Sequence, residues 1–314
     1  MIKIYIKNQK NNISIDEYVD NLKDNVIWID MLSPNKDEIN FVEKHFSIEL
    51  PNKQESEEIE ISSRYWEEHD RIEINSYFLV SNQDNARNET VSFILKNNFL
   101  ISIRYYDLKT FTELEKKYLF STKIFQDGSD ILNNILDIRI DSDADIIEQQ
   151  SRDITKLRRL VFTDYKNEDE EILEKISHYE DLNMKIRENI TDKQRILSSL
   201  LKSQNYKNEL KSELQVMIKD VRSLVEYTQF NFERLEYLQN IFLGVLSIEQ
   251  NKVIKIFTIV NVVFLPPTLI ASIYGMNFDI LPELHWEYGY LFSLGLMILS
   301  SITPIYIFKK KGWI

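Results

Sequence analysis

The sequence has no cysteine, and it has only six glycines and six prolines among 314 residues. Without cysteine the chain cannot be a disulfide scaffold, a thiolate zinc protein, an iron–sulfur protein or a cysteine hydrolase. A net charge of −12 argues against a nucleic-acid partner, because phosphate binding needs a basic surface. There is also no GxxxxGK[ST] phosphate loop and no recognisable nucleophile–base pair, so we do not expect an enzyme.

Charge is distributed unevenly along the chain. Residues 1–250 contain 33 basic and 47 acidic residues, whereas residues 251–314 contain five basic and three acidic residues. We therefore expect a large acidic soluble part followed by a small apolar end. Alternating β-branched and aromatic runs, followed by long stretches of good helix formers, predict an α+β fold. We divide it into a cytosolic α/β domain (1–128) and a region of long helices ending in a stalk helix (129–250).

Within the α/β domain, strands are expected at 1–7, 26–31, 71–80, 90–96 and 99–105, the last two joined by a tight turn at Asn97-Asn98. Ser33-Pro34 is expected to open a helix that ends near Phe46. Three long helices should follow Gly128, with breaks near residues 164–167 and 189–192.

Two uncharged runs near the C-terminus, 256–274 and 288–308, are each about as long as the ~20 apolar residues that cross a bilayer. The alternative is a pair of buried helices in a soluble core. We expect a first transmembrane helix at 251–274, an external loop at 275–287, a second transmembrane helix at 288–308 and a basic cytosolic tail at 309–314.

Basic residues predict the orientation of these spans. Lys252 and Lys255 precede the first span and three lysines follow the second, whereas residues 275–287 contain no Lys or Arg. By the positive-inside rule both termini are cytoplasmic. The start of the chain has no continuous apolar run of a signal peptide. We expect a multi-pass protein of the inner (plasma) membrane.

A polar stripe runs along the first span with spacings of three and four residues, which places its members on one side of a helix. It consists of Asn251, Ile254, Thr258, Asn261, Leu265, Thr268 and Ser272, here called the seam. Polar groups are costly in hydrocarbon, so the seam should face protein or water. Either it is a helix–helix interface joined by Ser, Thr and Asn, or several copies of the helix enclose a water-filled pore.

Pro266-Pro267 lies in the same span. Each proline removes a backbone donor, which frees the carbonyls of Val262 and Val263 and bends the helix. Such carbonyls could coordinate a cation at a lumen, or the prolines could form a packing kink. Both interpretations remain open from the sequence.

The first span ends in Tyr274-Gly275-Met276-Asn277, followed by Phe278, Leu281-Pro282-Glu283-Leu284, Trp286, a second span and a lysine-rich end. This ordered set resembles the CorA family of magnesium transport proteins. The resemblance is strong over residues 251–314 and architectural over residues 1–250. It implies a funnel-shaped homopentameric channel in the bilayer. It also implies a selectivity filter at Gly275, Met276 and Asn277, and a pore lined by Asn251, Ile254, Phe257, Thr258, Asn261, Leu265 and Thr268. We add Ser272 to the pore lining from the spacing alone.

Mg²⁺ dehydrates reluctantly, and a ring of Asn277 amides can bind its water shell. The resemblance implies passive uptake of hydrated Mg²⁺, with Co²⁺ or Ni²⁺ as lesser substrates, and we expect the membrane potential to drive it. Ile254, Phe257 and Leu265 are expected to act as dewetting gates. No organic cofactor is expected. The alternatives are a zinc transporter of the same superfamily and a non-conducting membrane-anchored helical scaffold or sensor.

Carboxylates are expected in two further roles. In the external loop, Asp279, Glu283 and Glu287 could attract cations. In the soluble part, divalent cations bound between subunits could regulate the channel. The candidate ligands are Asp141, Asp143, Asp145, Glu168, Asp169, Glu170 and Glu171. For each of them a solvated helix face is the alternative.

Overall fold

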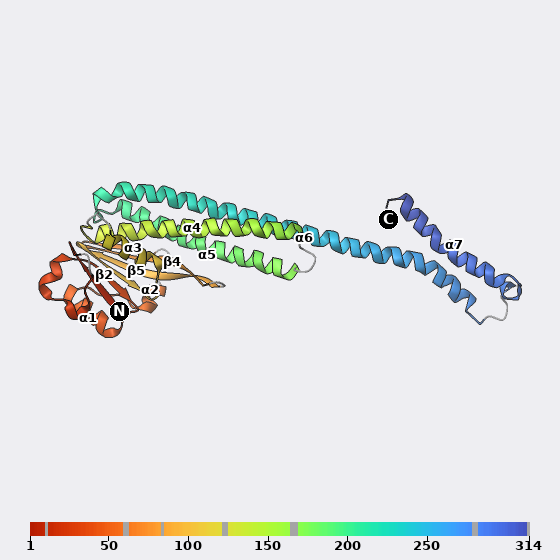
Figure 1. Cartoon of the computed structure of the whole chain (residues 1–314), viewed down its shortest axis with the longest axis horizontal. Helices are drawn as coiled ribbons and strands as arrows, with labels where there is room; N and C mark the ends of the chain where they lie inside the picture. Colours follow the sequence, from red (N-terminus) through yellow and green to blue (C-terminus); the bar gives the residue numbers. More distant parts are fainter. Residues whose placement is uncertain are drawn as a thin grey trace. The chain divides into compact units, whose positions relative to one another are not determined.

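The computed structural model describes residues 1–9, 12–58, 63–82, 85–120, 125–163, 169–277 and 282–312. The chain forms two compact units, Met1–Gln239 and Asn240–Ile314, and the division falls within the long helix α6 (Lys211–Tyr274). We describe each unit by itself (Figure 1).

A six-stranded mixed sheet forms the centre of the first unit. Its strands lie in the order β1-β2-β6-β5-β4-β3. β2 and β6 are parallel, and the other neighbouring pairs are antiparallel. The strands are β1 (Ile2–Ile6), β2 (Val26–Leu32), β3 (Tyr65–Glu68), β4 (Arg71–Asn82), β5 (Asn85–Lys96) and β6 (Phe99–Arg104).

Helices cover both faces of this sheet. The short helices are η1 (Ile15–Glu17), η2 (Asp20–Asn25), α1 (Lys36–Phe46), α2 (Lys53–Glu58) and α3 (Lys109–Phe120). The long helices α4 (Gly128–Thr163) and α5 (Asp169–Lys202) lie beside the first part of α6, which follows the short turn η4 (Asn208–Leu210) (Figure 1). In the second unit, η5 (Pro282–His285) connects α6 to α7 (Gly289–Lys310).

Two apolar cores hold these layers together. Trp28 and Phe93 of the sheet pack with Phe111 of α3 and Leu132 of α4 in the larger core. In the smaller core, sheet residues pack against α1. Trp28 is fully buried and stacks on Tyr5 with ring centroids 4.3 Å apart. Burial of one large apolar side chain contributes about 1.5–3 kcal/mol to the stability of the fold. Because the sheet contributes residues to both cores, packing stabilises it on both faces.

The five expected strands are all present, and β3 is an additional edge strand. The expected turn at Asn97-Asn98 is confirmed, since Asn97 has a φ of 52° between β5 and β6. Gly128 begins α4 where a Cβ would lie 2.4 Å from the backbone nitrogen of Leu100, so only glycine fits. The chain therefore needs glycine there for close approach to the sheet.

The expected start of the first helix at Ser33 is wrong. α1 begins at Lys36, and its N-cap is Asn35. The Asn35 side chain accepts the amide of Glu38, and the Glu38 carboxylate accepts the amide of Asn35, both at 2.8 Å. This reciprocal pair satisfies two amides that a helix leaves free, and it fixes the start two residues later than predicted.

The expected helix break near Asn189–Asp192 is also wrong, because α5 continues to Lys202. Asn189 donates to the carboxylate of Asp143 on α4 at 2.8 Å. Asp192 accepts the hydroxyl of Ser76 at 3.1 Å and the amide of Tyr77 at 2.9 Å. These polar side chains tie α5 to its neighbours. The break lies between Lys202 and Asn208 instead.

A buried ionic network continues from these contacts. Lys193 of α5 is 1% exposed, donates to the Tyr77 carbonyl at 2.6 Å and lies 3.4 Å from the carboxylate of Asp143. Arg139 of α4 also pairs with Asp143. Burial lowers the pKa of Lys193 to about 8, although Asp143 favours the charged form. The network joins β4, α4 and α5 through charges that are shielded from water.

Candidate ion pathway along α6

Both apolar runs form helices long and apolar enough to cross a membrane. The most apolar window of α6 has no buried residue, and that of α7 is 6% buried. The alternative of two helices buried in a soluble core therefore does not hold. The second unit presents apolar surface such as Leu299, which is 70% exposed, and such surface fits contact with lipid or with further protein.

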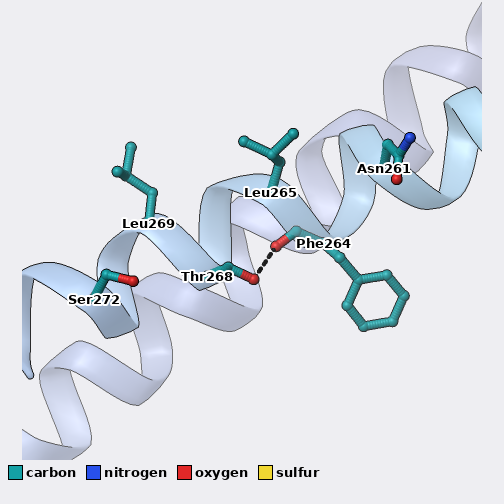
Figure 2. Close-up of a pocket in the computed structure, with 6 residues that line it drawn as sticks. All are labelled: Asn261, Phe264, Leu265, Thr268, Leu269 and Ser272. Carbon is teal, nitrogen blue, oxygen red and sulfur yellow. Dashed lines mark hydrogen bonds between the residues drawn. The ribbon is translucent and has the colours of Figure 1, made fainter.

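The seam lies on a surface of α6 that the rest of the chain leaves uncovered. All seven seam residues, and Phe257 beside them, are exposed: Asn251, Ile254, Phe257, Thr258, Asn261, Leu265, Thr268 and Ser272. Two shallow hollows follow this surface. One is lined by Asn251, Ile254, Lys255, Thr258 and Ile259. The other is lined by Asn261, Phe264, Leu265, Thr268, Leu269 and Ser272 (Figure 2).

Side chains in the second hollow differ in direction. Figure 2 shows Leu265 and Leu269 pointing to the same side of α6, whereas the ring of Phe264 points to the other side. Phe264 is 64% exposed and Leu265 is 66% exposed, so both large side chains are open in the single chain. An apolar Leu265 within a mostly polar seam is the arrangement expected of a constriction.

The two seam threonines use their hydroxyl hydrogens within the helix. Thr258 donates to the carbonyl of Ile254 at 2.8 Å, and Thr268 donates to the carbonyl of Phe264 at 2.7 Å (Figure 2). A hydroxyl has one donor and two acceptor lone pairs. With the donor engaged, each threonine presents an oxygen acceptor outward, which suits a cation or the water around it.

The backbone at the proline pair of α6 has a partner on α7. Pro267 has no amide hydrogen for the carbonyl of Val263, four residues earlier. The Ser301 hydroxyl of α7 lies 3.4 Å from that carbonyl oxygen and donates to it. The carbonyl of Val263 is thus engaged by a neighbouring helix within the same chain. Sequence reasoning did not single out Ser301, because nothing in an uncharged run marks which serine meets a freed carbonyl.

The C-terminal end of α6 has short backbone contacts. The amide of Gly275 donates to the Ala271 carbonyl at 2.9 Å, and that of Met276 to the Ile273 carbonyl at 3.2 Å. Gly275 does not have a left-handed φ, and a Cβ there would lie 3.1 Å from the Ala271 carbonyl. Gly275 lies in the turn that directly follows the last helical residue, Tyr274, and there glycine permits close approach to the Ala271 carbonyl. Asn277 follows directly and is exposed.

The loop at 275–287, between α6 and α7, is described only in part. Phe278, Asp279 and Leu281 lie outside the described residues, and so does the side chain of Glu283. Glu287 is exposed. Trp286 packs against Phe292 of α7 with ring centroids 5.7 Å apart, which anchors the end of the loop on the helix.

The candidate regulatory carboxylates lie in different environments. Asp141 and Asp145 are exposed on α4, and Asp143 between them is buried against Arg139 and Lys193. Glu170 is exposed, Glu171 pairs with Lys175 at 2.5 Å, and Glu168 and the side chain of Asp169 lie outside the described residues. Among the described residues, no group of three or more His, Asp or Glu could hold a metal ion within one chain.

The fold and the C-terminal pair of helices define a membrane protein with a large soluble unit. A family model described as "CorA-like Mg2+ transporter protein" matches residues 23–310. The chain belongs to this family.

Several curated relatives and solved structures are similar to the chain. It is 48% identical to the magnesium transport protein CorA of Wolinella succinogenes over 92% of each chain. It is 40% identical to that of Campylobacter jejuni strain RM1221 over the full length of both. The complete structure of the CorA magnesium transporter from Methanocaldococcus jannaschii superposes with a TM-score of 0.83 at 23% identity, covering 100% of this chain and 98% of the other. At that identity the superposition shows the same fold.

Proposed function

We propose that the chain transports Mg²⁺ across a membrane, as its relatives' names state for them. The observation that carries the proposal is the seam, which is polar, exposed and placed on one side of a membrane helix. Polar groups at that depth are stable only against water or other protein. A single helix cannot enclose water, so transport requires several copies of the chain.

We further propose a homopentamer with α6 innermost. Ser301 of α7 contacts α6 at Val263, which is off the seam, so the seam is left open for other copies or for water. In this arrangement five Thr268 hydroxyls and five Asn261 amides would face one axis. Each Thr268 would offer an acceptor oxygen, since its hydrogen is already bonded to Phe264.

Ion passage then follows from the chemistry of the lining. Mg²⁺ holds its water shell firmly, so a ring of Asn277 amides at the mouth would bind the hydrated ion through its waters. Ile254, Phe257 and Leu265 would form apolar constrictions that close the path by dewetting. The membrane potential supplies about 2.3 kcal/mol per charge per 100 mV, which is doubled for a divalent cation.

The orientation proposed from the lysines places both termini in the cytoplasm and the Asn277 ring at the outer surface of the inner membrane. In this orientation the lysines at 309–311 and the pair Lys252 and Lys255 all lie on the cytoplasmic side of the membrane. The exposed Glu287 would then lie near the outer mouth, with Asp279 and Glu283 close to it in sequence.

A regulatory cation site is proposed between copies of the soluble unit, with Asp141, Asp145 and Glu170 as candidate ligands because their carboxylates are exposed. Asp143 does not fit this role, because Arg139 and Lys193 already neutralise it in a buried site. Removal of cytosolic divalent cations should change Mg²⁺ conductance, and the double variant Asp141→Asn/Asp145→Asn should weaken that response.

The test of the proposed function is Mg²⁺ flux into liposomes that contain the purified full chain, at a fixed potential. Wild-type protein should carry Mg²⁺, and Asn277→Ala should lose most of this flux or its preference for Mg²⁺. Asn208→Ala, at an exposed site of the soluble unit, is the matched control and should transport normally. Absence of flux from the assembled wild-type protein would indicate a scaffold, and Zn²⁺ flux exceeding Mg²⁺ flux would indicate a zinc transporter.

A further inference from the structure

The serine and threonine hydroxyls of α7 donate to carbonyls in two different places, either within α7 or on α6. Ser293 and Ser300 donate to carbonyls three residues earlier, at 2.9 and 2.8 Å, and Thr303 donates to the carbonyl of Leu299 at 2.7 Å. These three bonds stay within α7. Ser301 instead donates across to Val263 of α6 at 3.4 Å. A serine inside a helix ordinarily bonds back onto its own helix, so the direction of Ser301 needs a reason.

Ser301 donates to the Val263 carbonyl, which has no backbone amide partner in α6 because of a proline. In a regular helix the carbonyl of Val263 would accept the amide of residue 267. That residue is proline, which has no amide hydrogen, and α6 nevertheless continues through both prolines to Tyr274. In hydrocarbon an unpaired carbonyl is costly, and hydroxyls of neighbouring helices can satisfy it. Ser301 supplies such a hydroxyl.

We propose that Ser301 is a positioning residue that holds the proline-containing segment of α6 in place through the Val263 carbonyl. The prolines separate the seam into one part, Asn251–Leu265, and a second part, Thr268 and Ser272, which is followed by the proposed filter at Gly275–Asn277. A contact at the prolines, where the helix lacks backbone hydrogen bonds, restricts the direction in which the following part of α6 continues. Ser301 therefore orients the filter-bearing end of α6 without facing the ion itself. The consequence for transport rests on the proposed function, whereas the contact does not.

The contact is tested first by stability, with four variants of the full chain: Ser301→Ala, Ser300→Ala, Pro267→Ala, and the double variant Pro267→Ala/Ser301→Ala. Each is unfolded in mixed detergent micelles by increasing SDS. Loss of an interhelical hydrogen bond in a membrane protein changes the unfolding equilibrium about threefold on average. Ser301→Ala should show a shift of that size. Ser300→Ala, whose bond stays within α7, should show a smaller one.

The double variant gives the decisive comparison. Pro267→Ala restores the amide that Val263 lacks, so the carbonyl no longer depends on Ser301. In that background Ser301→Ala should cause no further shift. An equal effect of Ser301→Ala with and without Pro267 would overturn the proposal, because Ser301 would then act through some other contact.

The consequence for transport is tested by separating the maximal Mg²⁺ flux from the half-saturating Mg²⁺ concentration. Ser301→Ala should lower the maximal flux per assembled channel. We expect a decrease of about threefold, which corresponds to the average free energy of one interhelical hydrogen bond. Ser301→Thr keeps the hydroxyl and should restore it, and Ser300→Ala should match the wild type. If Ser301→Ala and wild type give the same flux while the stability coupling is present, Ser301 braces the helix pair without positioning the filter. A wild type without flux would contradict the proposed function and leave the coupling result standing.

Discussion

Replacement of Asn261 by leucine tests whether the seam is wet. Asn261 is exposed near the middle of the first membrane span, and Thr258 and Leu265 are its neighbours on the seam. In a pentamer the change would replace five amides at one level by five apolar side chains. A hydrogen bond to a charged group contributes about 1.5–3 kcal/mol. If the hydrated ion loses one such bond at this level, the barrier rises by about 1.5–3 kcal/mol, and flux falls about 10-fold to 160-fold.

The assay is Mg²⁺ entry into liposomes, followed with an indicator dye at a fixed potential. Val262→Leu is the matched control, since Val262 is the next residue, is 38% exposed and lies off the seam. It should stay within about twofold of wild type, as expected for a conservative apolar change. The oligomeric state of each variant is measured by native mass spectrometry. Wild-type flux from a correctly assembled Asn261→Leu channel would refute the reasoning. Loss of assembly would indicate that Asn261 joins helices in a dry interface.

Two further predictions concern the soluble unit and use thermal unfolding in detergent, followed by fluorescence of a variant in which Trp66, Trp286 and Trp313 are replaced by phenylalanine, so that the signal comes from buried Trp28. Lys193 has a pKa of about 8 in the folded protein, below the value of about 10.4 for an unfolded chain, so the unfolded state binds more protons between these values. The free energy of unfolding should therefore increase as the pH rises from about 8 to about 10.4. Lys193→Met should abolish this increase. Lys185→Met, at a site more open to solvent, is the control and should retain it. Gly128→Ala should destabilise the unit by at least about 1–3 kcal/mol, because its Cβ would overlap the sheet backbone. The control Gly295→Ala lies in α7 of the second unit, where the added Cβ meets nothing within 4 Å, and it should change the transition of the soluble unit by less than about 0.5 kcal/mol.

Much of the fold follows from local patterns in the sequence. Alternation of apolar residues predicted five of the strands, and the uncharged runs predicted both membrane helices. These features depend on burial of one face or of a whole segment, and such burial leaves a periodic signal. The seam likewise followed from spacing, and the structure keeps its members together on one exposed surface.

The features that the sequence did not predict depend on contacts between distant segments. Asn189 and Asp192 have the composition of a helix break, yet their partners on α4 and β4 make them part of α5. Asp143 resembles its exposed neighbours in sequence, and only the fold shows that Lys193 lies 3.4 Å from it. Ser301 became identifiable only when α7 was placed beside Val263. Side-chain pairs across such separations have no local signature.

The most direct test of the central claim is the water accessibility of the seam. The natural sequence has no cysteine, so Asn261→Cys, Thr268→Cys and Leu299→Cys each carry a single thiol. The assembled full chain in lipid is treated with a charged, membrane-impermeant thiol reagent. Asn261→Cys and Thr268→Cys should react, whereas Leu299→Cys, on the apolar surface of α7, should stay protected. Protection of both seam positions in an intact oligomer would show the seam to be dry and would contradict an ion pathway along α6.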